Sequence, residues 1–359
     1  MEIATKLQKM VLILSLILIC LSGCASNSQK VRLKILIAGS LVVPFNELEK
    51  AYEESHPEVD VEIEAHGSIQ VIRHVTEIHD LVDIVVPADY ALISMLMYPN
   101  TVPENGESYA DWYVEFASNR LAIAYSPQSR YADEITEQNW YELLAKSDVR
   151  LGLSDPRFDA SGYRTLMIMQ LAEGVYQNPT IFEDIFLGQF KTAIGVKKAE
   201  GITTIHVPEV LEPTEQANLA MRGSSIALIA LLESGDIDYA FEYVSVIEQH
   251  GLRYLALPDP LNMGNPDLAD DYASVEVQLD FQRFSTVTPI FEGATIGYGV
   301  TIPSNAPHPE EAVDFLAFLF GPEGQAIMRA NQHPPLEYPL ASDFDGMPEE
   351  LLSLCVSRP

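Results

Sequence analysis

The sequence predicts an α/β protein made of two lobes, on three observations. The chain has 359 residues, which is enough for two domains of ordinary size. Short apolar runs alternate with amphipathic segments along most of it, as in parallel sheets built from βαβ units. Hydrophobic residues make up 47 % of the sequence and charged residues 20 %, which excludes a disordered or collagen-like chain.

The first lobe begins with a strand, a tight turn and a helix. Residues 31–38 (VRLKILIA) are rich in β-branched residues and leucine, which predicts a strand. Gly39 and Ser40 predict the turn, and a helical pattern of apolar residues follows through residue 54.

The same unit recurs directly afterwards. Residues 61–65 alternate apolar and acidic side chains, Gly67 and Ser68 make a turn, and residues 71–78 have one apolar helical face. Residues 81–86 (LVDIVV) then predict a buried strand, so the first lobe is expected to contain parallel sheet.

The middle of the chain repeats this architecture and predicts the second lobe. Strands are expected at residues 120–126, 150–154 and 237–243, and helices at 162–176 and 226–233.

A stretch rich in Pro, Asn and Asp up to residue 271 predicts a loop near a hinge. A further strand is expected at residues 296–302, and a helix at 310–320. We therefore expect the first lobe at residues 31–122 and 256–359, and the second at 123–255.

The N-terminal segment predicts export. Lys6 and Lys9 precede an apolar run at residues 10–20 that only Ser15 interrupts, and this run is too short to span a bilayer. It is typical of a signal peptide.

The run ends in L-S-G-C at residues 21–24, which resembles a lipobox, in which the chain is cut before the Cys and the thiol is lipidated. We expect a lipoprotein signal peptide at 1–23, a lipid on Cys24 and a polar tether at 24–30, with the alternative of an ordinary signal peptide. Either way the mature protein works outside the cytoplasm. Only Cys355 then remains as a thiol, so an intrachain disulfide is excluded.

The charge balance argues against a nucleic-acid partner. With 21 Lys and Arg against 52 Asp and Glu, the formal net charge is −31 at pH 7. Such a charge repels phosphate backbones and anionic lipids at long range. Contact with the membrane is therefore expected only through the lipid anchor.

Small hydroxyl residues stand at three predicted junctions of strand and helix. They are Ser40, Ser68 and Ser225, and each is expected near a helix N-terminus. Helix N-termini offer unpaired backbone N–H groups and a partial positive charge, so several that converge would hold an oxyanion without any Lys or Arg. One such serine alone ordinarily only caps its helix.

Four strings extend this interpretation by resemblance. AGSL from Ala38, HGS from His66, LSDPRFDASGYRTLM from Leu153 and LLESGDIDYAFEYVSVIEQHGL from Leu231 resemble the archaeal tungstate/molybdate-binding proteins of ABC transporters. The resemblance spans nearly the whole mature chain. It implies a two-lobed type II periplasmic-binding-protein fold with the ligand in the cleft between the lobes.

The resemblance also implies what the protein does and with what. The chain would be a monomeric receptor, not an enzyme, that captures tungstate or molybdate for a membrane permease and needs no cofactor. The ligand residues carried over by position are Gly39, Ser40, Ser68, Asp159, Ala160, Ser161, Ser225 and Tyr243.

Three of these positions depart from the family. Ala160 and Ser161 stand where the family has Pro and Cys, and Ser225 stands where it has a ligand Glu. In the family two carboxylates are thought to approach the metal of the oxyanion and expand its coordination. With Ser225 in place of Glu, we expect a less expanded coordination or a tetrahedral oxyanion held by hydrogen bonds. Asp159 would then turn aside or pair with Arg164.

Other readings of the same residues stay open. The ligand could be sulfate, phosphate or a chelated metal. A secreted hydrolase could use Asp159 with Ser161 or a histidine, although no nucleophile-and-base motif is present.

Two metal-binding alternatives are weaker. Tyr239 and Tyr243 face the same side of one strand and could bind iron, but no suitable His lies near them in sequence. His66, His74 and His79 are not spaced to share one helical face, and we interpret them as surface residues.

Overall fold

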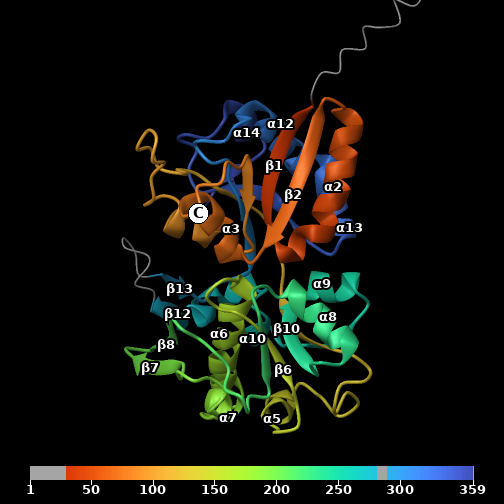
Figure 1. The fold of residues 1–359 in the computed structure, drawn as a ribbon, viewed down its shortest axis with the longest axis vertical. Coiled ribbons are helices and arrows are strands. Elements are labelled where there is room, and N and C mark those ends of the chain that lie inside the picture. Colours follow the sequence, from red (N-terminus) through yellow and green to blue (C-terminus); the bar gives the residue numbers. More distant parts are fainter. Residues whose placement is uncertain (1–29, 281–288, 359) are drawn as a thin grey trace, which may run out of the picture.

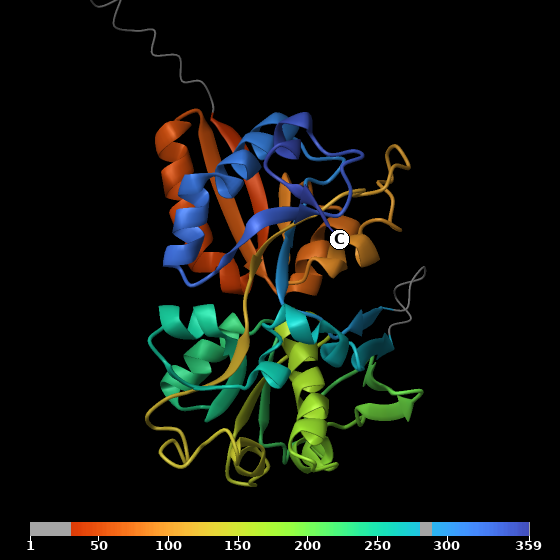
Figure 2. The same cartoon turned by 180° about the vertical axis from the view of Figure 1, so that it is seen from behind.

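The computed structural model describes residues 30–280 and 289–358, which fold into two lobes placed one above the other (Figures 1 and 2). The expected signal peptide and Cys24 lie outside these residues. In the described part of the chain, no helix combines the length and the apolar character needed to cross a membrane.

The first lobe is built on two sheets that a single bridge connects. Its parallel sheet has the order β2-β1-β3, and its second sheet has the order β14-β4-β15-β16. An antiparallel bridge between Val85 and Thr301 joins them. The strands are β1 (Val31–Ala38), β2 (Val59–His66), β3 (Ile84–Val86), β4 (Val114–Ser118), β14 (Gly297–Val300), β15 (Pro335–Ala341) and β16 (Val356–Ser357).

Helices cover this lobe and bury its apolar strands. Residues 35–38 of β1 are all buried, as a strand covered on both faces requires. The helices are η1 (Gly39–Leu41), α2 (Val42–Ser55), α3 (Ser68–Thr76), α4 (Ala91–Leu96), α12 (Pro309–Phe320), α13 (Pro322–Ala330) and α14 (Glu349–Leu352). The expected apolar face of residues 71–78 is shorter than predicted, because α3 ends at Thr76 and Ile78 is exposed.

The second lobe has a five-stranded sheet, β11-β5-β10-β6-β9, and a smaller sheet, β13-β12-β8-β7. In the larger sheet β10 is parallel to β6 and antiparallel to β5. The strands are β5 (Leu121–Tyr125), β6 (Leu151–Ser154), β7 (Gly195–Ala199), β8 (Ile202–Pro208), β9 (Leu219–Arg222), β10 (Tyr239–Tyr243), β11 (Arg253–Ala256), β12 (Val275–Asp280) and β13 (Ile290–Glu292).

One long helix dominates the helical layer of this lobe. It is α6 (Ala160–Val175), which contacts β6, β10 and β12. The other helices are α5 (Trp140–Leu144), α7 (Ile181–Phe186), α8 (Ile226–Ser234), α9 (Val244–Gln249), α10 (Asp259–Asn262), η2 (Pro266–Leu268) and α11 (Ala269–Tyr272).

The structure corrects the expected boundaries between the lobes. The chain enters the second lobe at residues 119–120, because β5 already pairs with β10. It returns between β13 and β14, since β12 pairs with β8 in the second lobe. The expected return at residue 256 is therefore wrong. The Pro- and Asp-rich stretch that suggested it folds into α10, η2 and α11 inside the second lobe.

Helix α6 offers a direct test of how tightly it packs on β6. A Cβ on Gly162 would lie 2.3 Å from the carbonyl oxygen of Ser154 and 2.7 Å from the nitrogen of Pro156. We expect Gly162→Ala to lower the free energy of unfolding by about 2 kcal/mol, because backbone atoms cannot yield as a side chain would.

Gly174 in the same helix is the matched control, since a Cβ there meets nothing within 4 Å. Gly174→Ala should raise stability by about 0.5 kcal/mol. Urea unfolding of both variants decides the point, and equal effects would contradict close packing at Gly162.

Candidate functional site

The helix N-termini that follow the central strands meet where the two lobes face each other. In the first lobe α3 starts directly after β2, and β1 and β2 run toward the lower lobe in Figure 1. In the second lobe α6 and α8 start shortly after β6 and β9. Parallel strands that end at one edge bring the helix starts to that edge, which is where such folds hold small ligands.

The lobes are in contact across this junction, so the structure is a closed state. The backbone N–H of Ile69 donates to the carbonyl oxygen of Phe158 at 3.0 Å. Gly67 lies so close to the second lobe that a Cβ would be 2.4 Å from that same oxygen. At Gly39 an added Cβ would be 2.7 Å from Cγ2 of Ile226. Two first-lobe glycines therefore provide the space for closure.

The Asp159 carboxylate joins donors from both lobes. Its Oδ1 accepts from the backbone N–H of Ser68 in the first lobe at 3.4 Å. Its Oδ2 accepts from the Ser154 hydroxyl at 2.6 Å and from the backbone N–H of Ser225 at 2.8 Å, both in the second lobe. Burial raises the pKa of Asp159, and these hydrogen bonds oppose the rise.

Of the two alternatives expected for Asp159, the pairing with Arg164 is not formed in this structure. The Arg164 guanidinium instead donates through Nη1 to the carbonyl oxygen of Ala88 at 2.7 Å and to the Tyr243 hydroxyl at 2.8 Å. Its Nη2 lies 3.2 Å from Oδ2 of Asp89. Ala88 and Asp89 belong to the first lobe, so Arg164 forms an ion pair and a hydrogen bond across the junction.

Tyr163 and Tyr243 belong to the same buried network. The Tyr163 hydroxyl donates to Oδ2 of Asp89 at 2.6 Å. Burial raises the pKa of both tyrosines well above the usual value, so each hydroxyl keeps its proton and remains a donor.

The predicted serines are all buried but differ in what their hydroxyls do. Ser40 shares a hydrogen bond with the Tyr298 hydroxyl at 2.9 Å, and Ser68 accepts from the backbone N–H of Ala88 at 3.0 Å. The Ser161 hydroxyl donates at 3.4 Å to the carbonyl oxygen of Phe241, within its own lobe. Of these serines, Ser68 and Ser225 contact Asp159 directly, through their backbone N–H groups.

Ser40 reaches the same region through a network that sequence reasoning missed. The Tyr298 hydroxyl also accepts from the Asn119 side chain at 3.0 Å, and Asn119 donates to Ser245 at 2.8 Å. Asn119 and Tyr298 lie beside the two crossings between the lobes. The Tyr298 hydroxyl and the Asn119 amide therefore connect the hinge to Ser40. Nothing in the local sequence around Asn119 or Tyr298 distinguishes them from ordinary strand-end residues.

Glu242 is a further residue that the sequence analysis missed. Its side chain is fully buried. Oε1 accepts from the Ser225 hydroxyl at 3.0 Å and from the backbone N–H of Tyr243 at 2.7 Å, whereas Oε2 has no hydrogen-bond partner among the described residues. Burial, with Asp159 nearby, raises the pKa of Glu242 to about 8. A charged residue inside the otherwise apolar and aromatic strand YAFEY was the available signal.

Two of the expected surface histidines lie together on β2 and α3. The rings of His66 and His74 stack with centroids 4.3 Å apart, and each offers a ligand atom within 4.8 Å of one from Glu64. Lys34 lies 3.1 Å from Glu64 and Asp80 lies 2.8 Å from His74, so these groups form an ion-pair cluster among themselves.

The other weak metal candidates are separated. His79 bonds to the Tyr109 hydroxyl at 2.7 Å, away from His66 and His74. The Tyr239 hydroxyl donates to the carbonyl oxygen of Arg130, so it is not directed to the junction where Tyr243 meets Arg164. The paired-tyrosine iron site is not formed in this structure.

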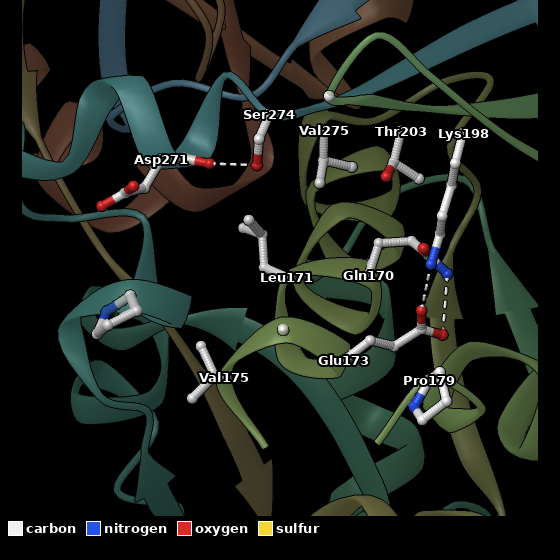
Figure 3. Close-up of a pocket in the computed structure, with 13 residues that line it drawn as sticks. Gln170, Leu171, Glu173, Val175, Pro179, Lys198, Thr203, Asp271, Ser274 and Val275 are labelled. Atoms are coloured by element: carbon white, nitrogen blue, oxygen red, sulfur yellow. Dashed lines mark hydrogen bonds and ion pairs between the residues drawn. The ribbon is translucent and has the colours of Figure 1, made fainter. Parts of the chain in front are cut away.

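A cavity of about 570 Å³ in the second lobe lies apart from these residues (Figure 3). It lies between α6, α11 and β12, and the Lys198 ammonium pairs with Glu173 at 2.8 Å on its wall. None of the predicted ligand residues lines it.

The sequence matches the family of bacterial extracellular solute-binding proteins over residues 33–331. The chain belongs to this family. An uncharacterized solute-binding protein of Methanoculleus marisnigri is 38 % identical over 327 residues, covering 91 % of this chain and 87 % of the relative.

Two archaeal relatives carry a ligand in their names. The molybdate/tungstate-binding protein WtpA of Thermococcus kodakarensis is 37 % identical over 354 residues, covering 94 % of this chain and 92 % of the relative. WtpA of Pyrococcus abyssi is 38 % identical over 355 residues, covering 95 % of each chain. The resemblance inferred from the sequence strings is thereby confirmed.

Solved structures share the fold. The periplasmic molybdate-binding protein of Azotobacter vinelandii superposes with a TM-score of 0.52 at 13 % identity, over 84 % of this chain and 98 % of that one. The sulfate-binding protein SubI of Mycobacterium tuberculosis gives 0.55 at 11 % identity, over 86 % and 88 %. The expected two-lobed periplasmic-binding-protein fold is confirmed.

The close approach at Gly67 gives a prediction about closure. Gly67→Ala would place a Cβ against backbone oxygens of Phe158 and Gly223, both in the second lobe. We expect this variant to keep its stability within about 0.5 kcal/mol but to hold the lobes apart, because the clash exists only between the lobes.

Gly223→Ala is the control, since its Cβ would make only ordinary contact with Gln70 at 3.8 Å. Small-angle X-ray scattering should show a larger radius of gyration for Gly67→Ala than for the wild type and the control. Identical scattering from all three would contradict the closed junction.

Proposed function

We propose that this chain is the extracytoplasmic receptor of an ABC transporter and that it closes its lobes on tungstate or molybdate. The observation that carries the proposal is the meeting of the N-termini of α3, α6 and α8, from both lobes, around Asp159. Backbone N–H groups at helix starts hold anions without a basic side chain, which suits a chain of net charge −31. The names of the two WtpA relatives support the choice of oxyanion.

The ligand set that we propose is the one expected from the sequence, with its roles refined by geometry. Ser161 contributes its backbone N–H at the start of α6, since its hydroxyl is engaged with Phe241. Tyr243 presents a hydroxyl that Arg164 holds in place. The full set is Gly39, Ser40, Ser68, Asp159, Ala160, Ser161, Ser225 and Tyr243.

Closure follows from where these residues lie. An oxyanion that contacts both lobes stabilises only the closed state and shifts the population toward it. The closed monomer would then dock on the permease. No cofactor and no catalytic step enter this mechanism.

The first test is calorimetric titration of the purified, ligand-stripped protein with tungstate, molybdate, sulfate and phosphate. We expect one-to-one binding of tungstate and molybdate with Kd of about 1 μM or tighter, and sulfate at least about tenfold weaker because it is smaller at equal charge. Tighter sulfate or phosphate binding would identify another oxyanion as the cargo. No binding of any oxyanion would contradict the proposal, as would turnover of a hydrolase substrate at the same residues.

Ser225 decides the coordination of the oxyanion in the same titration. Ser225→Glu would add a carboxylate beside Asp159 and Glu242, which repels sulfate, whereas a tungsten centre can take the carboxylate as a ligand. We expect the ratio of tungstate to sulfate affinity to rise at least about tenfold in this variant. Ser225→Ala, which removes only the hydroxyl, is the control. An unchanged ratio of tungstate to sulfate affinity in Ser225→Glu would show that this position does not set the coordination of the oxyanion.

We also propose that the receptor is tethered by a lipid on Cys24, on the strength of the L-S-G-C pattern. The lipid should retain the wild type in the membrane fraction and should be visible as added mass on the N-terminal peptide. Cys24→Ser should release the protein, while Cys355→Ser leaves its location unchanged because Cys355 is buried. Membrane retention of Cys24→Ser would rule out the anchor.

A further inference from the structure

Glu242 places a second carboxyl group directly beside the proposed ligand site. It lies at the carboxyl end of β10, between Ser225 at the start of α8 and Tyr243 at the start of α9. Oε1 accepts two hydrogen bonds from these neighbours. Oε2 is buried and has no partner in residues 30–280 and 289–358.

Ser225 links this carboxyl group to the carboxylate of Asp159. The Ser225 backbone N–H donates to Oδ2 of Asp159 at 2.8 Å, while the Ser225 hydroxyl donates to Oε1 of Glu242 at 3.0 Å. Two negative charges held by one residue in a water-excluded site repel each other strongly. A dianionic ligand at the same place would add to that repulsion.

No cation among the described neighbours neutralises the second charge. Arg164 is committed to Asp89, Ala88 and Tyr243. The other titratable groups that face this region are Asp159 before α6, Tyr243 on β10, Tyr298 on β14 and His333 before β15. Burial keeps both tyrosines protonated and lowers the pKa of His333 to about 4, so none of these three is charged at neutral pH.

The hydrogen-bond pattern indicates which oxygen carries a proton. Because Oε1 already accepts two hydrogen bonds, the proton of a neutral Glu242 would be on Oε2. A buried O–H without an acceptor is unfavourable, and an oxygen of a bound oxyanion would supply that acceptor. Hydrogen bonds from a donor to a charged acceptor are the strong ones.

We infer that Glu242 is held as a neutral acid and donates the hydrogen bond of its Oε2–H to the bound oxyanion, so that affinity depends on this one proton. The inference rests on the proposed oxyanion function and adds to it a residue that discriminates by protonation state. The Ser225 hydroxyl positions Glu242, and the contribution of Ser225 to the proposed ligand set is then its backbone N–H.

The direction of the pH effect follows from the raised pKa of about 8. Below that pH the acid is protonated and competent to donate, so affinity is constant. Above it the empty receptor loses the proton, and binding must recover it, so affinity falls by up to about tenfold per pH unit. In that range each oxyanion bound takes up close to one proton from solution.

Glu242→Gln separates the effect of the titrating proton from that of side-chain shape. The amide has nearly the same shape as the acid and keeps a hydrogen-bond donor, but it does not titrate. We expect tungstate titrations between about pH 6.5 and about pH 10 to show the fall for the wild type only. Glu242→Gln should bind within about threefold of the wild type at pH 7 and show a flat profile. Repeating the titration at about pH 9 in buffers of different ionisation enthalpy should give uptake of nearly one proton for the wild type and none for the variant.

Glu115→Gln is the matched control. Glu115 is a buried carboxyl on β4 whose pKa burial raises to about 7, but it pairs with Arg358 at 3.0 Å outside the proposed ligand set. This variant should keep the wild-type pH profile and proton uptake. Thermal melts of all three proteins confirm that each is folded over the pH range.

The outcomes separate this inference from the proposed function. A pH-independent wild type, or a fall and a proton uptake that persist in Glu242→Gln, would overturn the role of Glu242 while tungstate binding stands. If neither protein binds tungstate or molybdate at any pH, the proposed function itself fails and the inference fails with it.

Discussion

The closed arrangement of this molecule depends on one carboxylate that accepts from both lobes. Asp159 directly precedes α6, and its carboxylate accepts from the backbone N–H of Ser225 in its own lobe and from that of Ser68 in the other lobe. A carboxylate at helix starts is stabilised by their N–H groups and by the helix dipoles. The same carboxylate therefore joins the starts of α3 and α8 and the two lobes, and it occupies N–H groups that we propose for the oxyanion.

The buried charged groups at this junction differ in what stabilises them. Arg164 has Asp89 as its counter-ion, and Asp159 has hydrogen-bond donors in place of a cation. An unpaired buried charge is strongly destabilising, and Glu242, whose Oε2 has no partner among the described residues, has its pKa raised to about 8. Burial raises the pKa of both acids that contact Ser225, and hydrogen bonds from Ser154, Ser225 and Ser68 oppose that rise at Asp159.

Sequence reasoning reached the parts of the site that local pattern encodes. Ser40, Ser68 and Ser225 stand at junctions of strand and helix, which turn residues and apolar periodicity reveal. Asp159 and Tyr243 came from resemblance, because nothing in their spacing marks them. The sequence could not predict the ion pair between Arg164 and Asp89, because the two residues are remote in sequence. For the same reason it could not predict that β12 pairs with β8 in the second lobe.

The depth of the junction has a kinetic consequence. Ser40, Ser68, Asp159, Ser225 and Tyr243 are each at most 4 % exposed in the closed state. A ligand held among them has no path to solvent until the lobes separate. The residence time of the ligand is then governed by how often the hinge opens. Individual hydrogen bonds to the ligand affect the residence time only by changing how often the lobes open. Cargo release becomes a property of hinge motion, which a docked membrane partner can accelerate without touching the ligand.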